Sequence, residues 1–313
     1  FLLAKLSLNA EVYTDDDWTD SSRPDGKTIM FDIDGNKKNA WQTCVHYCDL
    51  ITAAGYTLEA DYTKNFAVHN EGSTENIFTI PLDKILYLNE FHYLFRSRHY
   101  AHGGAYSGAS ENGTCATLHT MAVNGFGTET PDARLDMNFY TGKVEVDSKY
   151  VTLDDGTPLE YKPLAVEKNL TASPYLETAG ARMKKYEVDR TAYSDGRMPD
   201  NDIVLYRYAD VLLMKSEAKV RNGESGDEEM NAVRSRVGMP SLPATLDNLL
   251  NERLLELVWE GWRRQDMIRF GTYCKQYDIH TPSEADKKGY TTVFPIPEKV
   301  RELNPNLKQN PGY

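Results

Sequence analysis

The carboxylates with the most suggestive spacing are Glu252, Glu256 and Glu260, which recur every four residues. Glycoside hydrolysis needs two carboxyl groups on opposite sides of a gap that water and substrate can enter. Residues four apart on a helix share one face instead, where arginines such as Arg253 and Arg263 can neutralise them. The spacing therefore predicts a structural ion-pair network and not a catalytic pair.

A second polar group, Asp32, Asp34 and Asn36, offers the carboxylate and amide oxygens that calcium prefers. Gly35 comes too early for an EF-hand loop, and Thr43 occupies the position where that loop has a bidentate glutamate. We therefore expect a solvated turn here, with calcium as the alternative and no other cofactor.

The four cysteines are too few for a disulfide framework in a chain of 313 residues. Cys44 and Cys48 stand four apart on an expected helix, but the sequence offers no further ligands that would complete a zinc site. We expect two small buried side chains and no metal.

Aromatic and basic residues crowd together between residues 87 and 106. Aromatic rings cover the apolar C–H faces of sugars, while arginine, histidine and asparagine satisfy the hydroxyl groups. The alternative is that half of these rings belong to the core. The predicted glycan-binding residues are Tyr87, Tyr93, Arg96, Arg98, Tyr100, Tyr106, Asn112 and Cys115.

Several classes of protein are disfavoured. The sequence contains no GxSxG, HExxH, phosphate-loop or dinucleotide motif, so an enzyme is not expected. A net charge of -12 argues against nucleic acid as a partner, because phosphate binding depends on clustered lysine and arginine. No apolar run approaches the roughly 20 residues of a membrane span.

The hydrophobic pattern predicts a mainly α fold with TPR-like helical hairpins, an irregular loop-rich lobe and short strands. Helices are expected over residues 1–10, 38–54, 203–221, 227–237 and 246–270, and a strand over 76–80. Prolines near the end predict a coil that wraps the surface. We divide the chain into a helical-repeat segment (1–60), a ligand-binding lobe (61–202) and a C-terminal helical region with its tail (203–313).

Three groups of residues resemble the signatures of the SusD/RagB family. The first is the helix pattern of Glu252, Arg253, Glu256, Leu257, Glu260, Gly261, Arg263, Asp266, Arg269 and Gly271. The second is the closing segment, with Phe294–Pro297, Asn304–Leu307 and Gln309–Tyr313. The third is the stretch from Asn231 to Pro240, which follows a helix carrying Tyr208, Ala209, Leu212, Glu217 and Ala218.

This resemblance implies a SusD-like fold in a bacterial lipoprotein at the outer-membrane surface. Such a protein binds oligosaccharide or polysaccharide without cleaving it and delivers it to a TonB-dependent SusC-like transporter. Family members are longer, so we expect an upstream segment with the lipid-anchored cysteine, and no other contact with the membrane. The alternatives are a protein- or peptide-binding helical-repeat scaffold and, less favoured, a glycosidase. The identity of the glycan stays open.

Overall fold

The helix expected over residues 38–54 is present as α3 (Ala40–Ala53) in the computed structural model, which describes residues 1–86 and 89–313. Asn39 and Gln42 cap its first turn reciprocally, because each side chain accepts a hydrogen bond from the backbone N–H of the other. The chain leaves the helix through Gly55, whose φ of +92° is easily adopted only by glycine.

The first segment of the chain packs against α3 as two short helices, α1 (Leu2–Leu8) and α2 (Ala10–Tyr13). The buried side of α1 contributes Ala4 and Leu8 to a core that also contains the fully buried Cys44 and Cys48. The expectation that both cysteine side chains are buried is therefore confirmed. The leucines at positions 2, 3 and 6 point elsewhere and are 56%, 53% and 43% exposed.

The acidic segment after residue 29 forms an antiparallel hairpin of β1 (Met30–Ile33) and β2 (Asn36–Asn39). Its two-residue turn is Asp34 and Gly35, both at positive φ, and the Asp32 carboxylate accepts a hydrogen bond from the Gly35 N–H at 2.7 Å. The interpretation of this segment as a solvated turn is confirmed.

The predicted strand is present as β3 (Asn76–Ile80), and its partner is β10 (Ile203–Arg207). The prediction that residues 203–207 begin a helix is therefore wrong. This stretch contains β-branched and aromatic residues, and its pairing with β3 outweighs the helical pattern. The helix begins only at α8 (Tyr208–Asn222), and α9 (Asp227–Arg236) follows close to its predicted position.

The helix expected over residues 246–270 is interrupted, so that prediction is also wrong. The structure has α10 (Leu246–Leu257), a turn, and α11 (Arg263–Arg269). Within the turn Trp259 and Gly261 have φ values of +67° and +83°. Contacts of Trp259 and Glu260 with distant segments hold the chain in this conformation, which local periodicity cannot reveal.

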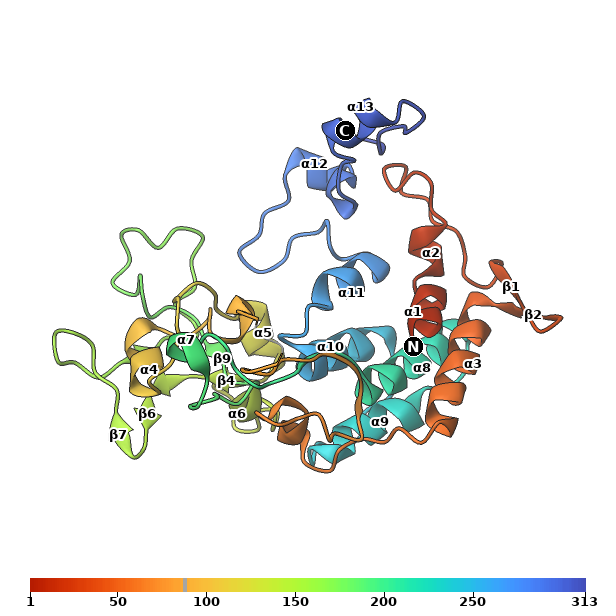
Figure 1. Cartoon of the computed structure of the whole chain (residues 1–313). Coiled ribbons are helices and arrows are strands. Elements are labelled where there is room, and N and C mark those ends of the chain that lie inside the picture. The colour runs from red at the N-terminus through yellow and green to blue at the C-terminus, as the bar shows by residue number, and fades with distance from the viewer. Residues whose placement is uncertain (87–88) are drawn as a thin grey trace.

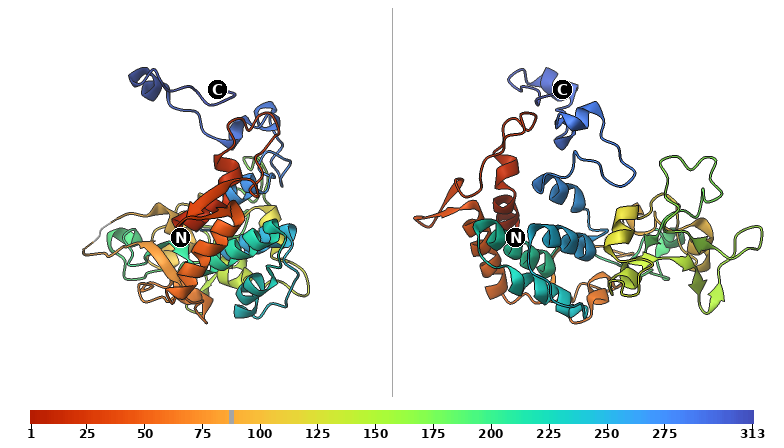
Figure 2. Two further views of the ribbon diagram at one scale, coloured as in Figure 1. Left: turned by 90° about the vertical axis from the view of Figure 1, so that its right-hand side faces the viewer. Right: turned by 180° about the vertical axis from the view of Figure 1, so that it is seen from behind.

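The proline-rich tail contains more helix than expected. Ser283 caps α12 (Glu284–Lys287) with a capping box, the 3₁₀ turn η3 (Tyr290–Thr292) follows, and Pro297 precedes α13 (Glu298–Leu303). Proline is well tolerated at the start of a helix because its missing N–H would have no partner there. Figures 1 and 2 show that α12 and α13 project beyond α11, and the segment around Gly289 lies against the loop that contains Trp18.

Short elements joined by long connections form the lobe, which lies on the opposite side of α10 from α1, α3 and α8 (Figure 1). Its helices are η1 (Tyr62–Phe66), η2 (His92–Leu94), α4 (Tyr100–Ala105), α5 (Leu118–Val123), α6 (Leu135–Asn138) and α7 (Tyr193–Gly196). Two-residue strands pair antiparallel as β4 (Phe139–Tyr140) with β9 (Arg182–Met183), β5 (Gly142–Lys143) with β8 (Glu160–Tyr161), and β6 (Glu145–Val146) with β7 (Lys149–Tyr150). The short strands and mainly helical scaffold agree with the predicted fold class.

The acidic face of α10 joins this lobe to the helices. Glu256 is fully buried and accepts hydrogen bonds from Arg134 in the lobe at 2.9 Å and from Arg207 at 2.6 Å, and it also pairs with Arg236. Glu260 pairs with Arg207 at 2.8 Å and with the buried Lys185 of the lobe. The predicted ion-pair network is therefore confirmed.

The partners of this network differ from those expected. Arg253 does not neutralise the glutamates but pairs with Asp210 at 2.7 Å and Asp266 at 2.9 Å. Arg263 instead donates to the backbone carbonyl of Leu250 at 2.8 Å. The glutamates are paired with cations from other segments because they face the interior and not the surface of their own helix.

Among the helices of residues 1–86 and 89–313, none has the length and apolar composition of a membrane span.

Candidate functional site

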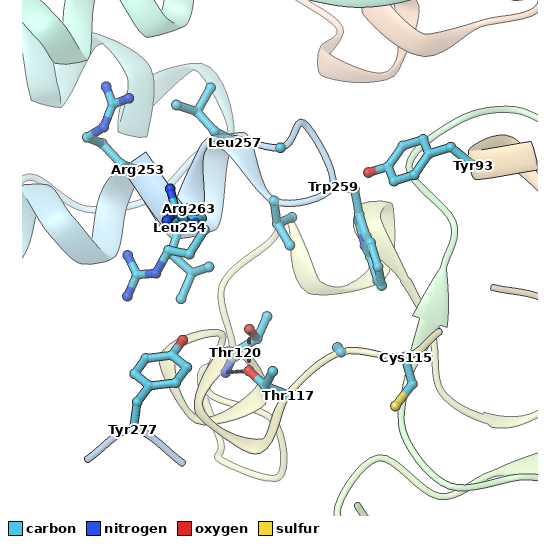
Figure 3. A pocket seen from close by; sticks show the side chains of 14 residues that line it. Tyr93, Cys115, Thr117, Thr120, Arg253, Leu254, Leu257, Trp259, Arg263 and Tyr277 are labelled. Carbon is cyan, nitrogen blue, oxygen red and sulfur yellow. Dashed lines mark hydrogen bonds between the residues drawn. The ribbon is translucent and has the colours of Figure 1, made fainter. Parts of the chain in front are cut away.

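A pocket of about 360 Å³ lies where the lobe meets the turn between α10 and α11 (Figure 3). It brings together two of the predicted residues, Tyr93 and Cys115, although they are distant in sequence. The remaining lining residues are Ala116, Thr117 and Thr120 from the lobe, Arg253, Leu254, Leu257, Val258, Trp259, Gly261, Arg263 and Arg264 from the α10–α11 region, and Tyr277. The pocket therefore combines aliphatic and aromatic walls with a few hydroxyl groups.

Tyr93 is the residue that links the predicted aromatic segment to the pocket. The neighbouring Leu94 is buried in the core. The ring of Phe91 packs edge-on against the ring of Tyr93, with centroids 6.3 Å apart. The Tyr93 hydroxyl is buried and has no hydrogen-bond partner within the described part of the chain. Burial, reinforced by the nearby Tyr186 and Glu260, raises the pKa of Tyr93 well above its usual range. Tyr93 therefore lines the pocket with a neutral hydroxyl.

Trp259 supplies a wall of the pocket from a strained backbone position. A left-handed conformation costs a residue other than glycine about 1–3 kcal/mol. The indole N–H donates to the Asn138 carbonyl at 3.1 Å, and the ring packs on Phe139 with centroids 5.8 Å apart. These lobe contacts hold Trp259 beside Tyr93, as Figure 3 shows.

The polar side of the pocket is built around the first turn of α5. Thr117 caps this helix by accepting a hydrogen bond from the Thr120 N–H at 3.2 Å, and the two hydroxyls are 2.9 Å apart. Tyr277 packs on His119 with ring centroids 4.8 Å apart. Burial lowers the pKa of His119, and the nearby Arg263 lowers it further. His119 is therefore a neutral ring that supports Tyr277.

Two other predicted residues lie outside this pocket and remain accessible to a polymer. Tyr100 begins α4 and is 60% exposed. Arg96 is exposed and lies 3.4 Å from Glu111, which also contacts His92. This exposed shoulder, defined by Arg96 and Tyr100, has the residue types expected for sugar contacts.

Arg98 and Tyr106 face the interior of the lobe. Arg98 is buried and donates to the carbonyls of Leu94 and Ala109 at 3.2 and 3.4 Å, and burial lowers its pKa. Tyr106 is half-buried with its hydroxyl 3.4 Å from that of Tyr140. Asn112 is half-buried, and Tyr87 lies outside the described residues. Arg98 and Tyr106 thus match the alternative interpretation, in which part of the aromatic segment is core.

The sequence analysis did not identify Trp259, Thr117, Thr120 or Tyr277. Trp259 sits inside a signature that was interpreted as one continuous helix, where a tryptophan is typical of the core. The useful signal was the Gly261 that follows it, because glycine near the end of a helical pattern marks a turn. Thr117 and Tyr277 carried no such signal, since only the fold places them together.

Comparison with known proteins identifies the class. The model of the SusD family (SusD_RagB) matches residues 54–313, and the chain belongs to this family. Over 139 residues it is 30% identical to the starch-binding protein SusD of Bacteroides thetaiotaomicron, covering 42% of this chain and 25% of that protein. Over 158 residues it is 28% identical to the SusD-like protein P38 of Formosa agariphila, covering 45% of this chain and 30% of that protein.

Solved structures show the same fold. A SusD superfamily protein from Parabacteroides distasonis aligns with a TM-score of 0.65 and 21% identity, covering 100% of this chain and 62% of that one. Surface glycan-binding protein A from Bacteroides thetaiotaomicron, in complex with laminarihexaose, aligns with a TM-score of 0.60 and 22% identity over 86% of this chain and 59% of that one. The family and the SusD-like fold predicted from the sequence are confirmed. The chain spans a quarter to a third of the curated relatives and about three fifths of these structures.

The expectation of a binding protein rather than an enzyme agrees with this membership. The starch-binding protein and surface glycan-binding protein A are both named for binding. The glutamates that could have served hydrolysis are fully buried and held by arginine and lysine side chains.

Proposed function

We propose that this chain is the glycan-binding part of a non-catalytic protein at the cell surface that captures oligosaccharide or polysaccharide. The observation that carries the proposal is the pocket in which Tyr93, Trp259 and Tyr277 surround a space of about 360 Å³ bordered by two threonine hydroxyls. Aromatic faces contact the apolar faces of sugar rings, and hydroxyl groups on the rim fix the orientation of the ligand.

The exposed shoulder extends this surface beyond the pocket. Tyr100 offers a largely solvated ring, and Arg96 offers donors for sugar hydroxyls. A glycan chain would thus place one end in the pocket and continue outward over the lobe. Arg98 and Tyr106 would support this surface from inside the lobe without touching the ligand.

For the cellular role, we propose that the protein is lipid-anchored in the outer membrane and passes its ligand to a TonB-dependent SusC-like transporter. Support comes from family membership and from relatives named as surface glycan-binding proteins. A pulldown of such a transporter from outer-membrane extracts of the source bacterium, grown on the preferred glycan, would test this partnership.

Affinity electrophoresis and calorimetry against neutral and acidic polysaccharides and their oligosaccharides would test glycan capture. We expect retardation by at least one glycan, with no release of reducing ends. Tyr93→Ala and Tyr100→Ala should weaken binding. Tyr150→Ala should not, although it removes a ring from β7 that is as exposed as that of Tyr100. A folded protein that binds none of these glycans but binds extended peptides would favour the scaffold alternative.

A further inference from the structure

The pocket differs in charge from the rest of the molecule. The chain has 47 acidic and 35 basic side chains, yet the pocket lining contains three arginines and no aspartate or glutamate. An acidic protein that keeps carboxylates out of one pocket has a local potential that favours anions there.

Two of the three arginines are already engaged. Arg253 is buried and paired with two aspartates, so its charge is neutralised. The Arg264 guanidinium lies between the rings of Tyr273 and Phe294, at 4.8 and 4.7 Å from their centroids, and donates to two backbone carbonyls. Its stacking fixes the tail of the chain against α11.

Arg263 is in a different situation. Its only hydrogen bond in the described ranges goes to the Leu250 carbonyl, and no carboxylate there lies within 4.0 Å of it. Its Nε is buried without an acceptor, and its guanidinium lies 6.0 Å from the Tyr277 ring centroid. Asp278, the acidic neighbour of Tyr277, is engaged elsewhere, because it accepts from the His119 N–H at 3.3 Å.

We infer that the pocket takes a sugar unit that carries a carboxylate, with Arg263 as the anion-binding residue. This inference rests on the proposed function and specifies its ligand. A guanidinium recognises a carboxylate through parallel charge-assisted hydrogen bonds, which are about twice as strong as neutral ones. A ligand acceptor at Nε would also remove the cost of a buried unpaired donor.

The neighbouring groups fit such a unit. Trp259 and Tyr277 flank the sugar ring, and the buried Tyr93 hydroxyl, which also lacks a partner in the described part of the chain, binds a ring hydroxyl. The volume lies at the small end of the range for ligand pockets, about 300–1,000 Å³. It suits one or two terminal units and not a long stretch of polymer.

A matched pair of ligands tests the inference directly. An oligogalacturonide and the same oligomer with its carboxyl groups reduced to primary alcohols differ only at C6 of each unit, which is charged in the first and neutral in the second. By calorimetry at low salt we expect the acidic oligomer to bind at least tenfold more tightly. Arg263→Gln should abolish that difference, and Arg263→Lys should retain part of it. Arg301→Gln, which removes the same charge from an exposed site in α13, should change nothing.

The outcomes separate this inference from the proposed function. Equal binding of the acidic and reduced oligomers, or binding of neutral glycans alone, would overturn the carboxylate inference and leave glycan capture standing. Retention of the difference in Arg263→Gln would overturn the role of Arg263. Absence of binding to every acidic and neutral glycan, with the thermal unfolding transition of the protein intact, would overturn both.

Discussion

The acidic face of α10 and the pocket beside it differ in how their buried polar groups are paired. On α10 and in the turn that follows it, Glu252, Glu256 and Glu260 have buried side chains in close contact with cations from other segments. In the pocket, Tyr93 and Arg263 each keep a buried polar atom that nothing in the described part of the chain satisfies. The carboxylates of the charge-rich region are therefore paired within the fold, whereas the hydroxyl of Tyr93 has no partner in the described part of the chain.

This contrast separates structural from functional polar groups. A buried carboxylate surrounded by guanidinium groups joins the lobe to the helices and has no capacity left for a substrate. An unpaired buried hydroxyl costs stability, so such a hydroxyl in a pocket is a candidate ligand contact. The sequence predicted the paired glutamates and the aromatic segment, and the fold adds Trp259 and Arg263 to one pocket with Tyr93.

The largest expected effect is a loss of stability at acidic pH, caused by protonation of the buried glutamates in and around α10. Burial alone would raise the pKa of Glu256, but the guanidinium groups of Arg236, Arg207 and Arg134 outweigh it and hold that pKa well below its usual range. Glu217 is likewise buried, and Arg269 and Arg221 lower its pKa to about 2. Because these pKa values are lower in the folded than in the unfolded state, their stabilisation is full above about pH 5 and lost as pH falls toward 2.

We therefore expect the free energy of unfolding, measured in urea, to drop by several kcal/mol between pH 7 and pH 3. High salt should not reproduce this loss at pH 7, because buried pairs are screened little. A free energy of unfolding that stays level over this pH range would remove the contrast between the two regions.

A single substitution in the network should have the next largest effect. Glu256→Gln leaves three arginines facing a neutral amide in the interior, and breaking a buried pair costs about 3–5 kcal/mol. Chemical denaturation measures this loss. The control is Glu284→Gln, whose side chain is 81% exposed and paired only with Lys287, where we expect a change below about 0.5 kcal/mol. Similar losses in both variants would show that the network is not what joins the lobe to the helices.

Removing one tyrosine hydroxyl should change the free energy of unfolding in opposite directions in the two regions. Tyr93→Phe deletes a buried group that has no partner in the described part of the chain, so the free energy of unfolding should stay level or rise by about 1 kcal/mol while glycan affinity falls. Tyr62→Phe deletes a hydroxyl that donates to Asn138 at 2.9 Å, so stability should fall by about 1 kcal/mol with no loss of affinity. Chemical denaturation measures the stability of both variants, and calorimetry measures their glycan affinity. A destabilised Tyr93→Phe variant would contradict the prediction.

The exposed shoulder should show the smallest effect. Tyr100→Ala removes a ring from solvent, so stability should change by less than about 0.5 kcal/mol. Affinity for a long glycan should fall about fivefold, or about 1 kcal/mol, because one stacking contact is lost. A short ligand confined to the pocket should bind as before. If both ligands lose affinity equally, the shoulder and the pocket are not separate contacts.

Local patterns predicted a good part of this molecule. The helix α3, the strand β3, the position of α9 and the turn at Asp34 and Gly35 all follow from residues within a few positions of one another. Prediction failed at β10 and at the α10–α11 turn. There, pairing with β3 and the contacts of Trp259 with the lobe override the helical period.

The sequence by itself determined the family, the mainly helical architecture and the segment that carries Tyr93, because signatures and turn chemistry are local properties. Only the tertiary structure decided which cations neutralise the glutamates, which aromatic residues are buried, and that Tyr93, Trp259 and Arg263 share one pocket. Those outcomes depend on contacts between segments that lie from 18 to 122 residues apart, whose geometry is set by the packing of the whole chain.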